Sequence, residues 1–335
     1  MAGEARQKAA RQKGGPRLLA TDREGALYLE RAHVHVEDGR VVYAVADDDL
    51  TRVYNIPHIN LAVLFLGQGT SITQDAMRLL GEEHVHLAVT GSGGSPMHMG
   101  ALTTYTATAH FRRMMPVYAE PARSLAAAKS LLRGRTERMR TIGAKAAGPL
   151  LRARDRSPLE KACARFAAEL DGCADLPQLL GHEGAFSKAC YRAFGTMAGL
   201  DGFRRTPGAD GSAAGSDDRT AVANRLIDHG NYLCYGMAGA ALWALGLPPH
   251  LSVLHGKTRA GGLVFDVADA FKDALVLPIA FHCATRLRDA DPEGAFRAKL
   301  IAAFDDHRIL VQAVEAIEDM LTAAGGPVPG APRDA

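Results

Sequence analysis

Three aspartates interrupt the segment LVFDVADAFKDALVLP at residues 263–278, which is otherwise apolar apart from Lys272. On a helix Asp266, Asp269 and Asp273 would lie within about 60° of one another. His255 precedes the first of them by eleven residues. Because an unpaired charge is costly to bury, these side chains must face water, bind a cation or cap a helix. Capping would explain Asp266 as an N-cap with Asp269 in the first turn. It leaves His255 and Asp273 unexplained, so metal binding is the alternative.

A further acid, Glu183, stands in the segment LLGHEGAFSKACYRAF, where we predict that it opens an amphipathic helix and shares a face with Ser187. Together with His255 and either Asp269 or Asp266, this acid would supply carboxylate oxygens and one imidazole. That ligand set suits Mg²⁺ or Mn²⁺ better than a structural zinc, which prefers thiolates and several imidazoles. A glutamate near a helix N-terminus is also common without any such function.

A strongly basic segment spans residues 123–156, which hold ten Lys or Arg residues against Glu137 and Asp155. Such a concentration of positive charge suits the phosphate backbone of nucleic acid. The alternative is an ordinary solvated helix face, which needs no ligand. The net charge of the whole chain, +2, does not decide between these two interpretations.

Several other patterns point away from particular functions. The sequence HGKT at 255–258 lacks the glycine that a phosphate-binding loop needs five residues before Gly256, because Leu251 stands there. The five cysteines show no C-x-x-C spacing, which favours a reducing cytoplasm over a disulfide framework. We expect no secretory signal at the basic N-terminus and, without a long apolar run, no membrane span.

The elements that position these residues are predicted to form an α+β protein whose first domain is rich in strands. Residues 18–108 indicate a β-rich, sandwich-like domain with one short helix, which Ser71 or Thr73 could cap. Alternating residues on either side of Asp38-Gly39 predict a hairpin. The continuous apolar run INLAVLFLG predicts a buried strand.

Residues 109–325 are predicted to form an all-helical catalytic domain. Its helices are expected at 121–142, 157–170, 183–200, 222–246, 263–288 and 293–323. A Gly/Ser/Asp-rich stretch at 206–220 predicts a mobile loop, and disordered tails are expected at 1–17 and 326–335.

The segment LIDHGNYLCYGMAGAALWALGLPPHLSVLHGKTRAGGLVFDVADAFKDALVLPIAF resembles the CRISPR-associated adaptation endonuclease/integrase family, and within it the I-F subtype most closely. The similarity extends through HEGAFSKACYRAF and back to YNIPHINLAVLFLGQGTSITQDAMRLL, so it covers nearly the whole chain. It implies an N-terminal β domain that forms a homodimer and a helical domain that holds a metal. The family's glutamate falls on Glu183 and its histidine on His255. Its D-x-x-D falls on Asp266 and Asp269, of which the second is more often the direct ligand.

The resemblance implies a DNA endonuclease/integrase that depends on Mg²⁺ or Mn²⁺. Such an enzyme captures short foreign DNA and inserts it into a CRISPR array as a new spacer, by attack of a 3′-hydroxyl on a phosphodiester. The expected partners are double-stranded DNA, a second copy of the chain and a small adaptation protein that this subtype fuses to its helicase–nuclease. Lys257 matches a basic position that helps to hold DNA phosphate. We expect the DNA backbone also to contact Arg133, Arg135, Arg138, Arg204 and Arg205.

Two other functions would use the same residues. A metal-dependent nuclease without integrase activity needs the same ligands, and the sequence does not separate it from an integrase. A DNA-binding scaffold would use the acidic cluster structurally and would show no dependence on a metal.

Overall fold

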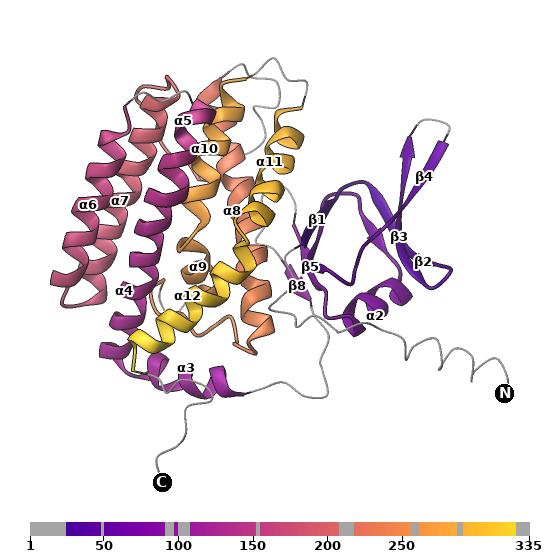
Figure 1. Cartoon of the computed structure of the whole chain (residues 1–335), viewed down its shortest axis with the longest axis horizontal. Helices are drawn as coiled ribbons and strands as arrows, with labels where there is room; N and C mark the ends of the chain where they lie inside the picture. Colours follow the sequence, from indigo (N-terminus) through magenta and orange to yellow (C-terminus); the bar gives the residue numbers. More distant parts are fainter. Residues whose placement is uncertain are drawn as a thin grey trace, which may run out of the picture.

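The computed structural model describes residues 25–47, 50–90, 97–99, 108–151, 155–207, 218–255, 261–286 and 291–325. A β-rich N-terminal domain is followed by a larger helical domain (Figure 1), which is the α+β arrangement that the sequence predicts. The tails expected at 1–17 and 326–335, and most of the loop expected at 206–220, lie outside the described residues. Within the described part of the chain, no helix is both long enough and apolar enough to cross a membrane.

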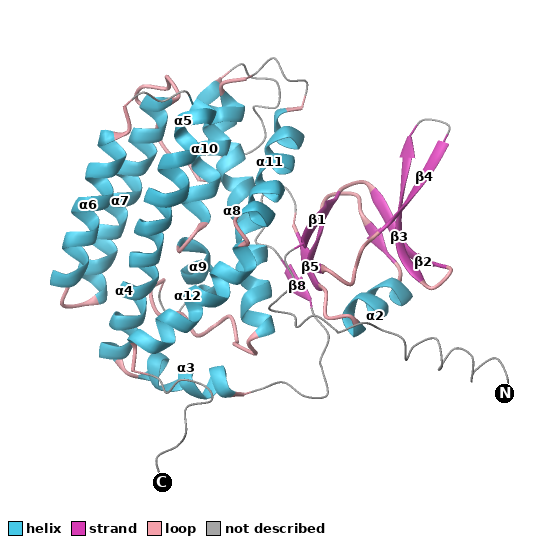
Figure 2. Ribbon diagram, viewed as in Figure 1, coloured by secondary structure: helices cyan, strands magenta, loops and turns pink. Residues whose placement is uncertain are grey.

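The described part of the β-rich domain contains two four-stranded sheets (Figure 2). The first has the order β1 (Gly25–Leu29), β5 (Leu61–Leu66), β7 (His86–Val89) and β8 (Met97–Met99), with the first three strands parallel. The second has the order β4 (Leu50–Asn55), β3 (Arg40–Asp47), β2 (Ala32–Glu37) and β6 (Ser71–Ile72). The short helix α2 (Gln74–Glu82) is capped by Thr73, whose side chain accepts from the Ala76 amide.

The predicted hairpin and the predicted buried strand are both present. Asp38 and Gly39 have φ values of 48° and 74°, as a two-residue hairpin turn of the primed type requires. Every residue of β5 is buried because the strand has a core on each side. Phe65 packs into the core of the helical domain, whereas Leu64 packs into the core of the β-rich domain. This strand therefore joins the two domains.

The helical domain is built around α8 and α10. The elements before α8 are α3 (Ala109–Ala119), α4 (Pro121–Arg138), a π-helical turn (Met139–Gly143), α5 (Ala144–Leu151), α6 (Ser157–Gly172) and α7 (Leu176–Met197). They are followed by α8 (Arg219–Ala244), α9 (Gly262–Asp269), α10 (Lys272–Ala284), α11 (Pro292–Asp306) and α12 (Ile309–Ala323). Helix α10 is buried on nearly every side, as its apolar composition predicts.

Two helices that the sequence predicts as continuous are each broken, so those two predictions are wrong. The helix expected over 263–288 is α9 followed by α10, and the one expected over 293–323 is α11 followed by α12. Between α11 and α12, Arg308 has a φ of 49°, a left-handed conformation that interrupts a helix. Neither break coincides with a glycine or proline, the residues that usually mark a helix end in a sequence.

Gly236 of α8 lies close against β5 at the contact between the domains. A Cβ atom added there would lie 2.1 Å from Cε1 of Phe65, which is fully buried. We expect Gly236→Ala to lower the free energy of unfolding by about 1–3 kcal/mol, because neither core has room for the displaced ring. Urea unfolding measures the change.

Gly181→Ala on α7 is the matched control, since nothing lies within 4 Å of a Cβ atom added there. It should raise the free energy of unfolding by ~0.5–1 kcal/mol, because alanine loses less backbone entropy in a helix. An equal response of the two variants would contradict the close contact at Gly236.

Candidate active site

The site residues come from several elements that meet in the helical domain. Asp266 and Asp269 lie on α9, and His255 lies in the connection between α8 and α9. Glu183 lies on α7. The sequence predicts that Glu183 opens its helix, but α7 begins at Leu176, so Glu183 is a mid-helix residue and that prediction is wrong.

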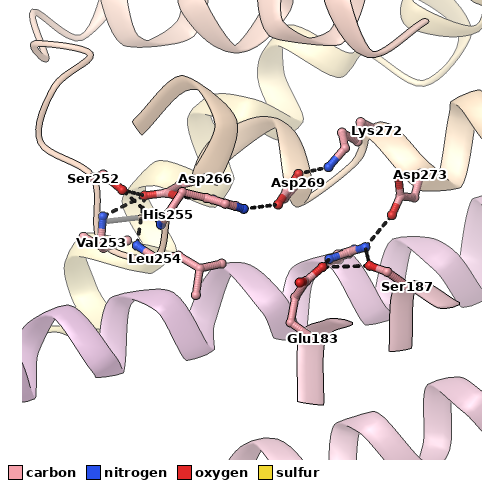
Figure 3. Close-up of polar contacts among 11 residues, drawn as sticks. Glu183, Ser187, Ser252, Val253, Leu254, His255, Asp266, Asp269, Lys272 and Asp273 are labelled. Carbon is pink, nitrogen blue, oxygen red and sulfur yellow. Dashed lines mark hydrogen bonds and ion pairs between the residues drawn. The ribbon is translucent and has the colours of Figure 1, made fainter. Parts of the chain in front are cut away.

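Asp266 organises the chain that carries His255. Its Oδ2 accepts hydrogen bonds from the hydroxyl of Ser252 (2.9 Å) and from the amides of Val253 (2.7 Å) and Leu254 (3.1 Å). Its Oδ1 accepts from the amide and from Nδ1 of His255, at 3.1 and 2.6 Å (Figure 3). Several donors of this kind are what allow a fully buried carboxylate to remain charged. Asp266 is therefore not the N-cap of its own helix, which begins at Gly262.

His255 directs a basic nitrogen at a second carboxylate. In the neutral form of the ring, the hydrogen bond from Nδ1–H to Asp266 leaves the lone pair on Nε2. Nε2 lies 3.3 Å from Oδ2 of Asp269. A lone pair and a carboxylate oxygen repel each other at this distance unless a proton or a cation lies between them. Neighbouring ligands of an octahedral Mg²⁺, each at ~2.1 Å from the ion, are about 3 Å apart, so this pair fits a divalent cation.

Lys272, at the start of α10, forms an ion pair with Oδ1 of Asp269 (Figure 3). Burial lowers the pKa of its ammonium, and this effect outweighs the opposite influence of Asp273 and Glu183. Sequence reasoning noted Lys272 only as an exception in an apolar segment and gave it no role. A lone lysine among residues that must be buried was the signal, since a buried ammonium requires an acidic partner.

Arg135, on α4, holds the other acids of the site. Its side chain is 2% exposed, and its guanidinium contacts Oε1 of Glu183 and Oδ2 of Asp273, each at 2.5 Å. It also donates to the hydroxyl of Ser187 at 2.6 Å, and that hydroxyl donates to Oε1 of Glu183 at 2.7 Å. Ser187 thus shares a helix face with Glu183. The expectation that Arg135 holds DNA does not fit this placement, because its guanidinium has no exposed face for a phosphate.

The charge of Arg135 keeps its two acids ionised. Burial alone would raise the pKa of Glu183, but the charge and hydrogen bond of Arg135, with help from Ser187, bring it below its usual value. Burial likewise acts to raise the pKa of Asp273, and Arg135 and Lys272 together bring it below its usual value. Both carboxylates are therefore anionic at neutral pH although they lie in the protein interior.

The remaining basic residues expected to bind DNA differ in exposure. Arg133 is exposed and pairs with Asp171, and Arg204 is exposed. Arg138 is half-buried against Gln312 of α12, and Arg205 is half-buried in an ion pair with Asp228 of α8. Lys257 lies outside the described residues.

Among the described residues, the site contains more negative than positive charge. The site holds four carboxylates and two basic side chains. The carboxylates are those of Glu183, Asp266, Asp269 and Asp273, and the basic side chains are those of Arg135 and Lys272. With His255 neutral, as a metal-binding imidazole must be, a surplus of two negative charges remains, which suits a divalent cation. No three His, Cys, Asp or Glu side chains of the described residues are grouped as metal ligands. Glu183 contacts Arg135, whereas His255 and Asp269 face each other.

Comparison with known proteins defines the family. The family model described as CRISPR associated protein Cas1 matches residues 27–293, and the chain therefore belongs to this family. The CRISPR-associated endonuclease Cas1 of Pectobacterium atrosepticum is 33% identical over 316 residues, which cover 90% of this chain and 94% of that protein. The protein of the same name from Pseudomonas aeruginosa is 34% identical over 318 residues, with coverage of 90% and 94%. The family expected from the sequence is thus confirmed.

Solved structures share the fold. A crystal structure of a TtCas1–DNA complex matches with a TM-score of 0.66 at 27% identity, covering 92% of this chain and 95% of that one. A casposase bound to its integration product matches with a TM-score of 0.63, covering 89% and 91%, but at 14% identity. The second likeness therefore concerns the fold alone.

Arg135→Met should lower the free energy of unfolding by about 3–5 kcal/mol at pH 7, because it leaves two buried carboxylates without their cation. The deficit should be full above about pH 5 and should shrink below about pH 4. The folded-state pKa values of Glu183 and Asp273 lie below their usual values, so the stability that Arg135 supplies is present above the unfolded pKa and is lost as the pH falls. Denaturant unfolding across this pH range measures the difference from the unmodified protein.

Arg133→Met is the control for Arg135→Met. It removes the same kind of group two residues earlier in the chain, where Arg133 forms an exposed ion pair with Asp171. It should change the free energy of unfolding by less than ~0.5 kcal/mol. A deficit of Arg135→Met that does not depend on pH would show that packing, and not charge, makes Arg135 important.

Proposed function

We propose that the protein is a DNA endonuclease/integrase that depends on Mg²⁺ or Mn²⁺ and inserts captured DNA into a CRISPR array. The observation that supports this most directly is the approach of Nε2 of His255 to Oδ2 of Asp269, 3.3 Å away, in a site that holds four carboxylates. The relatives from Pectobacterium atrosepticum and Pseudomonas aeruginosa are named endonucleases, and TtCas1 is known in complex with DNA.

His255, Asp269 and Glu183 would hold the cation. When bound, the ion would lower the pKa of a hydroxyl that attacks phosphorus and would neutralise the charge that develops on the phosphate oxygens. Water as the attacking group gives cleavage, and the 3′-hydroxyl of a captured fragment gives joining. The product therefore depends on which hydroxyl enters the same site.

The protein's own residues prepare this site. Asp266 fixes the tautomer and the orientation of the His255 ring, so Nε2 is already directed at Asp269. Arg135 and Ser187 share one oxygen of Glu183, Oε1, which restrains that side chain and leaves Oε2 without a contact to either residue. Because such restraint is established before a ligand binds, little ordering remains to be done during the reaction.

The DNA backbone would be held mainly by the exposed arginines, Arg133 and Arg204, with Lys257 and the half-buried Arg138 and Arg205 in supporting positions. Contacts to phosphate give binding that depends strongly on salt and little on sequence.

The proposed assembly is a homodimer formed through the β-rich domain. Val53 and Tyr54 on β4 and Ile59 beyond it are exposed large apolar side chains, and their burial against a second copy would be favourable. The I-F subtype, the adaptation partner fused to its helicase–nuclease and the cytoplasmic setting belong to the same proposal. A symmetric dimer would carry two sites, as the joining of both ends of one fragment requires.

The reaction is tested with a supercoiled plasmid that carries a CRISPR array and a short duplex with free 3′-hydroxyl ends. His255→Ala, Asp269→Asn and Glu183→Gln should each abolish cleavage and joining in Mn²⁺ or Mg²⁺. Asp266→Asn should weaken activity by about 10- to 100-fold, as loss of a group that orients a metal ligand usually does.

Thermal unfolding of each variant checks that the fold is intact. Cleavage without joining by the unmodified protein would favour the nuclease interpretation. DNA binding with no effect of any divalent cation would favour the scaffold.

DNA binding is tested with Arg133→Glu combined with Arg204→Glu. The double variant should bind duplex DNA more weakly at every sequence, and the slope of log affinity against log salt should fall by about one for each phosphate that is no longer neutralised. Arg78→Glu on α2 is the control, because Arg78 is 52% exposed and lies in an ion pair, much as Arg133 is 51% exposed. An unchanged affinity in the double variant would mean that these arginines form only a solvated helix face.

A further inference from the structure

Lys272 places a positive charge beside the carboxylate that the proposed metal ion would also use. Its side chain is 12% exposed, and its ammonium pairs with Oδ1 of Asp269. Oδ2 of the same carboxylate faces Nε2 of His255. A single carboxylate is therefore shared between an internal cation and the nitrogen that fits a divalent cation.

The two cations cannot both keep Asp269 without a strong repulsion. In the protein interior, a unit charge and a divalent ion a few ångströms apart repel more strongly than they would in water. This repulsion favours the departure of one of them, and the ammonium has the freedom to move. It sits at the end of a flexible four-carbon chain and carries three donors that can turn to other acceptors.

Two other carboxylates, Asp273 and Glu183, lie near enough to interact with this ammonium. Asp273 and Glu183 both act on the ammonium of Lys272 and both favour its charged form. Each already contacts Arg135 through one oxygen, Oδ2 and Oε1 respectively. If Asp269 moved instead of Lys272, it would leave His255, and the two groups whose geometry fits the ion would be separated.

We propose that Lys272 is the resident counter-cation of the metal-free site, and that it gives up Asp269 when a divalent cation binds. This inference rests on the proposed function, because it requires a divalent cation at His255 and Asp269. Before the ion binds, the ammonium holds the carboxylate in position. The ion then replaces a positive charge instead of entering an anionic site that has no cation. Ion binding is therefore weaker than it would be without Lys272.

The proposal predicts opposite effects of Lys272→Met on stability and on ion binding. Without Mn²⁺, the variant should unfold at a lower temperature than the unmodified protein, because Asp269 loses its partner. With Mn²⁺, it should bind the ion about tenfold more tightly or better, because no ammonium has to be displaced. The increase in unfolding temperature on adding Mn²⁺ should accordingly be larger in the variant.

The experiment uses the full chain and two measurements, calorimetric titration with Mn²⁺ and thermal unfolding with and without Mn²⁺. Lys188→Met is the matched control, because Lys188 is an exposed lysine of α7 outside the site, and its loss should leave Mn²⁺ affinity within about twofold. Lys272→Arg keeps the charge and should bind Mn²⁺ no more tightly than the unmodified protein. If Lys272→Met does not fold, Lys272→Gln carries the same prediction, since it keeps a donor for Asp269 without the charge.

The outcomes separate this inference from the function on which it rests. Tighter Mn²⁺ binding by Lys272→Met than by the unmodified protein and Lys188→Met supports the displacement. Equal or weaker binding overturns it and leaves the proposed metal site intact. If the unmodified protein and Asp269→Asn both fail to bind Mn²⁺, the metal site and the displacement are overturned together. A metal-free double-mutant cycle of Lys272→Met with Asp269→Asn then tests whether the ion pair alone stabilises the fold.

Discussion

The helical domain depends on pairing the charged groups that the described residues place in its interior. Asp266 is satisfied by donors from one short stretch of backbone, and Asp273 by the guanidinium of Arg135. These contacts fix where α4, α7, α9 and α10 lie relative to one another, because each element supplies a charge that another must neutralise. Loss of one partner would leave an uncompensated charge in the interior, which is strongly destabilising.

The parts of the fold that follow local rules could be predicted from the sequence. The turn at Asp38-Gly39 depends on two residues that accept positive φ, and β5 reveals itself as a short, continuous apolar run. The break between α9 and α10 follows no such rule. It separates Asp269 from Asp273, and the first faces His255 whereas the second faces Arg135. The spacing of the apolar residues does not predict this break, because it depends on contacts with residues distant in the sequence.

For the site, residue types predict a chemistry, but they do not predict the position of each group. An imidazole and several carboxylates on buried segments pointed to a cation. The distinction between an exposed arginine, such as Arg133, and a buried one, such as Arg135, was not available, since both lie in the same basic helix. Burial is decided by which face of α4 meets α7 and α10. A helical period of 3.6 residues turns positions two apart to nearly opposite sides, but the sequence does not say which side is inside.

The strand β5 has a consequence for how the molecule can be divided. Its side chains are divided between two cores, and the ring of Phe65 occupies the space that Gly236 leaves open on α8. A fragment cut between the two domains would lose that ring and would expose an apolar notch on its longest helix. The boundary between strand-rich and helical sequence is therefore not a seam at which the protein could be separated into independent modules.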